Sequence, residues 1–315
     1  MAGSSLFAFS GLEAMVSDLS ISRTMPYTTL GRTGVKVSKL GLGCAPLGID
    51  SLDPLEANKL VAKAFSDGVT YFDVAPNYAG GRSEERLGDA LKDFRKEVFL
   101  VTKTEESSYE GTWKLINQSL KRMKTDYIDL VHIHNLGKED RWPDLDKAFS
   151  DEGAMGALRE AKQKGVIRFI GASGHVFPSR MHYAIDSGEI DVMMVAVNYI
   201  IQHNYDFEHK IWSRALTKDI GMVAMKVLGG AENSSRTHRI PVEDYEMAIR
   251  YSVTLNGLSS AVVGVKSLQE YNLLINTFLD AKPLSEDEYY ALSKKGLEIL
   301  EREERWRTMH GLPLT

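Results

Sequence analysis

The chain has 315 residues, of which 43% are apolar and 26% are charged, as in an ordinary globular protein. Its 43 acidic and 38 basic residues give a net charge of −5 without any basic run, which argues against nucleic acid and membrane surfaces as partners. Cys44 is the only cysteine, so an internal disulfide and a cysteine metal cluster are excluded, and we expect a reducing, cytoplasmic location. No apolar run approaches the roughly 18 residues of a membrane span.

Residues 1–25 differ in composition from the rest of the chain. They are rich in serine, and Arg23 is their only basic residue. The apolar run 6–9 is too short for a secretory signal, and no basic residue precedes it. An organelle-targeting peptide is the alternative, although the acidic residues of this segment argue against one. We expect a flexible or loosely packed extension, followed by a single domain over 26–315, since no later linker or composition break is visible.

The next segments predict a β-hairpin followed by a repeating strand–helix pattern. Residues 27–30 and 35–38 are short apolar-polar alternations around a turn with Gly31 and Gly34. Eight short apolar runs follow at intervals of roughly 30 residues, each succeeded by a helical pattern, which is typical of βα units on a parallel sheet. These runs start near Lys39, Thr70, Val98, Asp129, Ile167, Asp191, Met222 and Ser259.

Several helices are indicated by their caps and by 3.6-residue periodicity. Asp53 and Pro54 are a typical helix start, and Gly68 a typical end. The predicted helices are 54–67, 83–92, 112–123, 155–164, 241–255 and 285–304.

A closed (β/α)8 barrel and an open doubly wound sheet both contain such strand–helix units. The even spacing and the count of eight favour the barrel. The chain also lacks the Gly-x-Gly-x-x-Gly turn that an open dinucleotide-binding sheet needs. We therefore predict an α/β fold, a TIM barrel whose base is closed by the N-terminal hairpin.

Three consecutive predicted strands end in reactive side chains. Asp73, Lys103 and His134 occupy these ends, and Tyr78 follows Asp73 after a proline turn. Working residues of parallel barrels lie at the C-terminal ends of the strands, so we expect these four side chains to meet at one rim. They suit proton donation to a carbonyl oxygen.

The chemistry explains why these residue types belong together. A free tyrosine has a pKa of about 10, which is high for proton exchange at neutral pH. The Lys103 ammonium would lower the pKa of Tyr78, and Asp73 would keep that lysine charged and in place. His134 could donate a hydrogen bond that orients the carbonyl oxygen.

Each residue also has a structural explanation: an Asx turn for Asp73, packing for Tyr78, a surface ion pair for Lys103 and a satisfied histidine for His134. The joint pattern favours catalysis. Two rival functions stay open. One is a non-catalytic redox sensor on the same barrel. The other is a metal-dependent hydrolase using His132 and His134, which share a strand face, although no further histidine ligands are evident.

The sequence resembles the aldo-keto reductase superfamily from about residue 27 to residue 285. The segments that carry the resemblance are 40–43 (LGLG), 72–78 (FDVAPNY), 81–88 (GRSEERLG), 101–103 (VTK), 127–134 (YIDLVHIH), 167–173 (IRFIGAS) and 225–230 (MKVLGG). The resemblance implies a barrel that uses NADPH or NADH without a Rossmann motif. It also implies Tyr78 as general acid, a small-molecule carbonyl or alcohol substrate, and a monomer by default.

The resemblance implies cofactor contacts at strand ends, with departures from the family pattern. Gly174 replaces the usual Asn after Ser173, Met194 the usual Gln, and Met225 the usual stacking aromatic. Many family members that use NADPH have an Arg after the eighth strand that pairs with the 2′-phosphate. Two alignments of this chain with that pattern are possible, and they place Glu270 or Asn272 at the position of this Arg. We therefore expect a weaker NADPH preference than usual, or NADH use. The expected cofactor residues are Gly43, Cys44, Ser173, Gly174, Met194, Met225, Lys226, Leu228, Gly264, Lys266 and Ser267.

The substrate pocket is less evident from the sequence. Loops at the rim offer apolar, aromatic and histidine side chains, and the loop 137–142 is expected to form one wall. The polar segment 232–240 could fold over the cofactor. The candidate rim residues are Pro46, Leu47, Trp142, His175, Tyr199 and Trp306, of which we select Pro46, Trp142, His175 and Tyr199 as substrate contacts.

Overall fold

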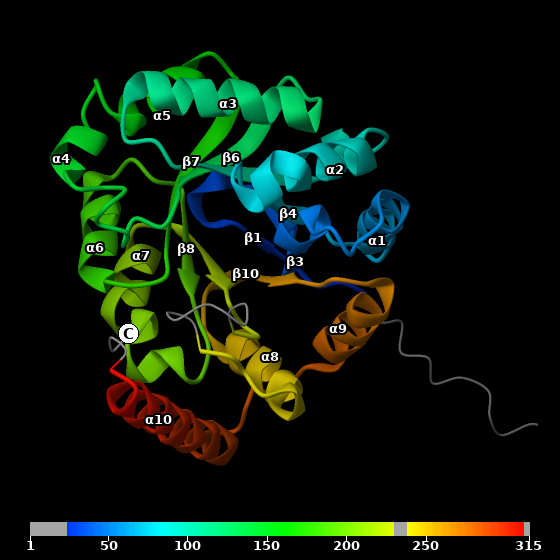
Figure 1. Ribbon diagram of the computed structural model, residues 1–315, viewed down its shortest axis with the longest axis vertical. Coiled ribbons are helices and arrows are strands. Elements are labelled where there is room, and N and C mark those ends of the chain that lie inside the picture. Colours follow the sequence, from blue (N-terminus) through cyan, green and yellow to red (C-terminus); the bar gives the residue numbers. More distant parts are fainter. Residues whose placement is uncertain (1–23, 230–237, 312–315) are drawn as a thin grey trace, which may run out of the picture.

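Eight parallel strands close into a barrel, and helices surround it (Figure 1). The computed structural model describes residues 24–229 and 238–311, so most of the expected extension and most of the segment 232–240 lie outside it. The barrel order is β10-β3-β4-β5-β6-β7-β8-β9, which confirms the predicted TIM barrel. The strands are β3 Leu40–Gly43, β4 Tyr71–Asp73, β5 Phe99–Thr104, β6 Ile128–Ile133, β7 Ile167–Gly174, β8 Val192–Ala196, β9 Gly221–Met225 and β10 Leu258–Gly264.

The predicted hairpin is present and closes the base of the barrel. Strands β1 Tyr27–Thr29 and β2 Lys36–Ser38 pair antiparallel across a turn that ends at Gly34 with φ of 68°, where glycine is favoured. Leu30 and Val37 are fully buried in the apolar cluster inside the barrel. Met25, which we assigned to the extension, is also buried in the core, so the packed domain begins before residue 26.

The six predicted helices are all present with shifted ends, and further helices that were not given ranges lie between them. Helix α3 starts earlier than expected because Ser108 caps it by accepting from the Gly111 N–H at 3.1 Å. Helix α10 runs beyond residue 304, and its residues up to Met309 stay helical until the turn at Gly311. The helices are α1 Pro54–Ser66, α2 Arg82–Leu91, α3 Tyr109–Met123, α4 Leu145–Ala148, α5 Ala154–Gln163, α6 Pro178–Ser187, α7 Ser213–Thr217, α8 Tyr245–Thr254, α9 Leu268–Asp280 and α10 Glu286–Met309.

Side-chain alternation divides the core into two apolar clusters. Inward residues such as Tyr71, Val101 and Leu130 fill the barrel interior, and their outward neighbours pack under the helices. The rows that end in Asp73 and Lys103 therefore point into the barrel mouth. No helix within residues 24–229 and 238–311 is both long and apolar enough to cross a membrane.

Glu208 carries a partly buried carboxyl group in the segment between β8 and α7. It begins a π-helical turn, Glu208–Trp212. Its Oε1 accepts a hydrogen bond from Tyr251 Oη at 3.0 Å, whereas its buried Oε2 has no hydrogen-bond partner among the described residues. Burial raises the pKa of Glu208 to about 7.

We predict that Glu208 makes stability fall as pH rises. A carboxyl whose folded pKa is raised stabilises the fold below its unfolded pKa, and this contribution is lost as pH passes its folded pKa of about 7. The free energy of unfolding of the wild type, measured by urea titration, should fall by about 2–3 kcal/mol between mildly acidic and mildly alkaline pH. Glu208→Gln should flatten this dependence, and the exposed control Glu298→Gln should keep it. Parallel pH profiles for wild type and Glu208→Gln would contradict the assignment.

Candidate active site

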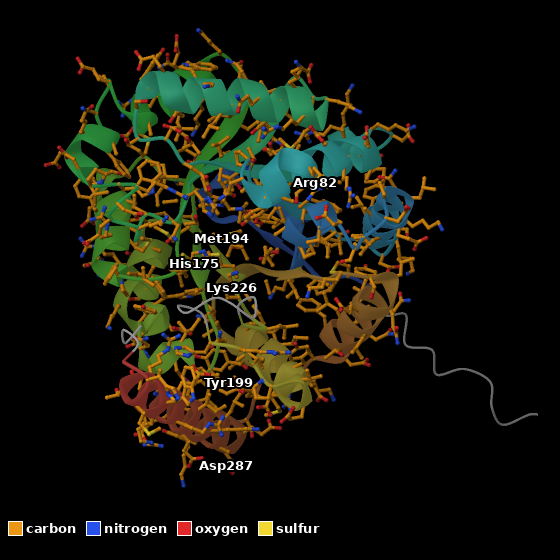
Figure 2. All side chains as sticks on the ribbon, in the orientation of Figure 1. Arg82, His175, Met194, Tyr199, Lys226 and Asp287 are labelled. Atoms are coloured by element: carbon orange, nitrogen blue, oxygen red, sulfur yellow. The ribbon has the colours of Figure 1, made fainter. Side chains whose placement is uncertain are left out.

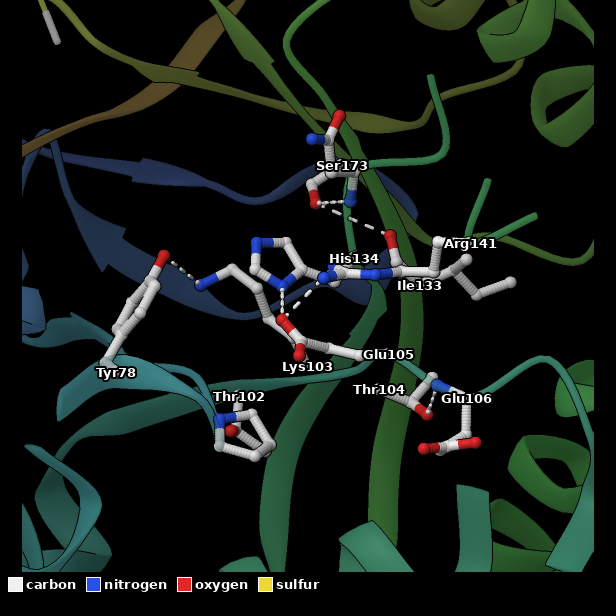
Figure 3. Close-up of polar contacts among 12 residues, drawn as sticks. Tyr78, Thr102, Lys103, Thr104, Glu105, Glu106, Ile133, His134, Arg141 and Ser173 are labelled. Atoms are coloured by element: carbon white, nitrogen blue, oxygen red, sulfur yellow. Dashed lines mark hydrogen bonds and ion pairs between the residues drawn. The ribbon is translucent and has the colours of Figure 1, made fainter. Parts of the chain in front are cut away.

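Lys103 joins two of the other predicted catalytic residues at the barrel mouth. Its Nζ donates to Asp73 Oδ1 at 2.7 Å, to the Val74 carbonyl at 2.8 Å and to Tyr78 Oη at 3.4 Å (Figure 3 shows the bond to Tyr78). The Lys103 and Asp73 side chains are only 1% and 7% exposed. Burial alone would lower the pKa of Lys103, but Asp73 and Tyr78 together outweigh it and raise that pKa. Lys103 is therefore held as an ammonium.

The structure reverses one expectation about Tyr78. We expected Lys103 to lower the pKa of Tyr78 below its ordinary value. Burial is the larger effect, and the pKa of Tyr78 is raised even though Lys103 pulls it down. Tyr78 is thus a protonated donor at neutral pH, with Lys103 limiting how far its pKa rises.

A buried acid outside the predicted set holds the loop that carries Tyr78. Glu84 is fully buried on α2, and its carboxylate accepts from Thr102 and Ser119 hydroxyls at 2.8 and 2.6 Å. Arg122 Nη1 connects this carboxylate, at 3.1 Å, with the Pro76 carbonyl, at 3.2 Å. The motif at 81–88 pointed to this segment, but its partner on α3 could not be read from the sequence.

The Arg122 guanidinium also explains Gly81. Gly81 has φ of 99°, and a Cβ there would lie 2.4 Å from Arg122 Cζ. Ala79 and Gly80 also have positive φ, so the chain turns sharply directly after Tyr78. This turn lets the Tyr78 side chain reach Lys103 while the main chain passes into α2.

His134 approaches the site from β6 and is held by residues that the sequence did not single out for this role. Its Nδ1 lies 2.5 Å from Glu105 Oε1, and its carbonyl accepts from Trp142 Nε1 at 2.9 Å. The Tyr78 and His134 rings are 6.2 Å apart and nearly perpendicular. Burial, followed by Lys103, lowers the pKa of His134 well below its usual range. All four predicted catalytic residues therefore gather at one mouth.

The expected nicotinamide residues lie around the same mouth. Ser173 is fully buried, and its Oγ accepts from the Asn135 N–H at 3.0 Å. A Cβ at Gly174 would lie 2.5 Å from the Met181 sulfur, so the Met181 side chain packs directly over this glycine. Met194 and Met225 belong to the cluster inside the barrel, and Met225 keeps 8% exposure.

Lys226 lies directly after β9 (Figure 2). Its backbone is in the left-handed conformation, with φ of 60°. It has no acidic partner among the residues that the structure describes. Burial, followed by repulsion from Lys103, lowers the pKa of Lys226, whereas Asp73 raises it. Its ammonium thus adds positive charge beside the Asp73–Lys103 pair.

Further expected cofactor positions lie on the β3 and β10 side of the mouth. Cys44 is fully buried, and its N–H donates to the Asp73 carbonyl at 2.7 Å. Gly43 and Gly264 pack closely, with a Cβ on Gly43 meeting the Gly264 nitrogen at 3.1 Å. Leu228 is half-buried after Lys226.

The start of α9 carries an acidic side chain. Ser267 caps the helix by accepting from the Glu270 N–H at 3.1 Å, and Glu270 Oε2 accepts from the Lys266 N–H at 2.7 Å. The Glu270 carboxylate thus binds one of the backbone N–H groups at this helix start, where a phosphate could otherwise bind.

Two of the four expected substrate contacts are wrong in this structure. Trp142 is fully buried behind His134, which it supports through its ring N–H. Tyr199 is fully buried toward α8 and α10, where its Oη donates to Asp244 at 2.8 Å (Figure 2). Pro46 and His175 are half-buried and stay available at the rim. Loop aromatics were assigned by residue type alone, and their burial depends on distant helices.

The metal alternative has no ligand set in the described part of the chain. His132 is fully buried and in register with Lys103, and its pKa is lowered well below the usual range by burial. Within residues 24–229 and 238–311, no three His, Cys, Asp or Glu residues are grouped to hold a metal ion.

Comparison with known proteins identifies the family. The profile described as "Aldo/keto reductase family" matches residues 39–244, well over half of the chain. The chain belongs to the aldo/keto reductase family. L-galactose dehydrogenase of Arabidopsis thaliana is 34% identical over 188 residues, covering 54% of this chain and 56% of that protein. Pyridoxal 4-dehydrogenase of Microbacterium luteolum is 25% identical, covering 85% and 96%. This chain spans about half the length of the first curated relatives it matches.

A solved structure agrees with the fold. The holo form of the aldo-keto reductase AKR11C1 from Bacillus halodurans has a TM-score of 0.70 at 22% identity, covering 86% of this chain and 96% of that one. The aldo/keto reductase family implies a nicotinamide cofactor, and the residues present fit such a group. Lys226 presents a cation at the mouth, and the α9 N-terminus offers backbone donors toward a phosphate.

We predict that the Asp73–Lys103 pair makes Lys103 important for stability as well as for chemistry. Lys103→Met leaves the Asp73 carboxylate buried without its cation, and should lower the free energy of unfolding by about 3–5 kcal/mol in urea titrations. Adding Asp73→Asn should recover part of this loss because the stranded charge is removed. The exposed control Lys59→Met should change stability by less than about 1 kcal/mol. A Lys103→Met loss equal to that of the control would contradict a buried, charged pair.

Proposed function

We propose that this aldo/keto reductase family member is an NAD(P)(H)-dependent oxidoreductase that interconverts a small-molecule carbonyl and an alcohol. The observation that carries the proposal is the arrangement of Asp73, Lys103 and Tyr78 in one hydrogen-bonded chain, with the His134 ring 6.2 Å from the Tyr78 ring. The dehydrogenase names of the relatives agree with such chemistry. A cytoplasmic location and a monomeric state remain predictions.

The chain's own residues supply the proton. When bound, the reduced nicotinamide supplies a hydride to the carbonyl carbon. Tyr78 Oη donates its proton to the oxygen, where a positioned acid contributes about 10²–10⁴-fold to the rate. Lys103 stabilises the tyrosinate that remains, and Asp73 keeps Lys103 charged and directed at Tyr78. The raised pKa of Tyr78 keeps its proton in place until the substrate oxygen becomes basic.

Cofactor choice follows from the charge at the start of α9. The 2′-phosphate distinguishes NADPH from NADH and carries negative charge. Glu270 places a carboxylate at this helix start, where its Oε2 accepts from the Lys266 N–H. Repulsion between the two negative groups offsets the attraction of the Lys266 side chain. We therefore infer dual cofactor use or a preference for NADH.

We predict that Tyr78→Phe removes nearly all reductase activity. The substitution deletes the hydroxyl that accepts from Lys103 at 3.4 Å, so cofactor affinity should change little, and the free energy of unfolding should fall by about 1 kcal/mol as one buried hydrogen bond is lost. The assay is a panel of sugars, aromatic aldehydes and quinones with each cofactor, read by nicotinamide absorbance. Retention of wild-type rates by Tyr78→Phe would show that the assigned acid is wrong. Cofactor binding without turnover of any carbonyl would instead favour the redox-sensor alternative.

We predict comparable kcat/KM values with NADPH and NADH. Glu270→Gln should shift the ratio toward NADPH by about tenfold, because one repelled charge corresponds to roughly 1–1.5 kcal/mol near a surface. Asp280→Asn, at the other end of α9, is the matched control and should leave the ratio unchanged. A wild-type preference for NADPH of about a hundredfold or more would contradict this inference.

A further inference from the structure

Asn135 turns the chain at the barrel mouth directly after His134. Its backbone is left-handed, with φ of 53°, a conformation that asparagine and glycine adopt more readily than other residues. The Asn135 N–H donates to Ser173 Oγ at 3.0 Å, and the Leu136 N–H donates to the Ser173 carbonyl at 2.7 Å. These two bonds fasten the turn to the end of β7.

A backbone N–H fixes the orientation of the Asn135 side-chain amide. The His175 N–H donates to Asn135 Oδ1 at 3.4 Å, and because an N–H can only donate, the amide oxygen faces the end of β7. Asn135 Nδ2 lies on the other side of the amide, and it donates no hydrogen bond to any residue within 24–229 and 238–311. The side chain is half-buried, so it holds two unused amide hydrogens in a fixed direction beside β7.

The side chains next to Asn135 on β7 and β8 carry no amide. Gly174 has no side chain, and Met194 carries only a thioether. The Ser173 hydroxyl accepts from the Asn135 N–H and donates to the Ile133 carbonyl at 3.4 Å (Figure 3). These three positions therefore offer little that can pair with a polar group of a ligand.

Asn198, which follows β8, has an amide that is already in use. Its Nδ2 donates to the Lys226 carbonyl at 2.9 Å. Its Oδ1 accepts from the N–H groups of Ile200 and Ile201 at 3.0 and 2.9 Å. Of the two asparagines that follow β6 and β8, Asn135 is thus the one that keeps donors for a ligand.

The left-handed turn alone does not explain an asparagine at this position. Glycine adopts the same conformation without steric cost, and both bonds to Ser173 come from main-chain groups that a glycine would keep. Asparagine adds a primary amide with two N–H donors. The proton donor Tyr78 and its partner Lys103 come from the β4 and β5 side, so an amide beside β7 is placed for the cofactor rather than for the reacting oxygen.

We propose that Asn135 is a cofactor-binding residue whose Nδ2 donates to the carboxamide oxygen of the nicotinamide. The carboxamide is itself a primary amide, and burying an amide without partners costs free energy, so a site that holds the nicotinamide must satisfy it. Asn135 lies outside the expected cofactor set because it comes from the segment after β6 and reaches the end of β7 through its turn. This inference rests on the proposed NAD(P)(H) use and identifies how this chain recognises the nicotinamide half.

The first test measures dissociation constants by isothermal titration calorimetry with NADPH, NADH and ADP-ribose, which lacks the nicotinamide. Asn135→Gly keeps the left-handed turn and removes the amide, so it should weaken binding of both dinucleotides about tenfold and leave ADP-ribose binding unchanged. Asn135→Asp keeps an oxygen for the His175 N–H but has no amide hydrogens, so it should also weaken only the dinucleotides. The exposed control Asn117→Asp, on α3, should bind all three as the wild type does.

The second test alters the ligand atom instead of the protein. Thio-NADP⁺ has sulfur in place of the carboxamide oxygen, and sulfur is a weak hydrogen-bond acceptor. The wild type should bind NADP⁺ more tightly than thio-NADP⁺, whereas Asn135→Gly should bind the two about equally. A role of Asn135 confined to the turn would leave the preference for oxygen over sulfur unchanged in Asn135→Gly.

Two results would overturn the proposal. One is wild-type affinity of Asn135→Gly for NADPH and NADH. The other is an equal loss of affinity for the dinucleotides and for ADP-ribose, which would place the effect outside the nicotinamide half. Binding of neither dinucleotide by the wild type would contradict the proposed function and this inference together, whereas normal dinucleotide binding by Asn135→Gly contradicts the inference alone.

Discussion

The buried ion pair between Asp73 and Lys103 is the interaction on which the rest of the site depends. Taking two charges out of water costs several kcal/mol per ion, and only close pairing with further hydrogen bonds offsets that cost. The barrel meets this requirement by setting the ends of β4 and β5 side by side. The Val74 carbonyl and Tyr78 Oη accept the remaining Lys103 donors. Tyr78 is therefore placed by the same ammonium that the buried carboxylate needs.

Two further acids support the site from outside this pair. Glu84 accepts hydrogen bonds from two hydroxyls and from Arg122. Because Arg122 also binds the Pro76 carbonyl, this network holds the loop that carries Tyr78 in place. Glu105 holds the His134 ring from behind, together with Arg141. In both cases a carboxylate and an arginine from a later segment fix a reacting side chain. Such networks are strong only when every member is satisfied, which makes the geometry at the mouth sensitive to changes in residues that touch no substrate.

The parts of the site that could be predicted were those set by local pattern. Alternation along each strand placed Asp73 and Lys103 at the mouth, because inward rows of apolar residues lead up to them. The assignments that failed concerned burial. Trp142 and Tyr199 were assigned to the rim as loop aromatics, but each is covered by elements distant in sequence. The direction of the Tyr78 pKa also failed, since it balances a cation against desolvation.

The sequence by itself determined the barrel, the N-terminal hairpin that closes its base and the strand ends that carry the reactive side chains. Spacing, alternation and caps are local properties, and eight repeated units leave few ways to close a sheet. Only the tertiary structure decided which carboxylate pairs with which basic group. Lys103 pairs with Asp73, and Glu105 contacts His134 and Arg141. It also decided which groups keep their protons. Both depend on distances and burial across separate elements, and neither is written in the order of residues along one strand.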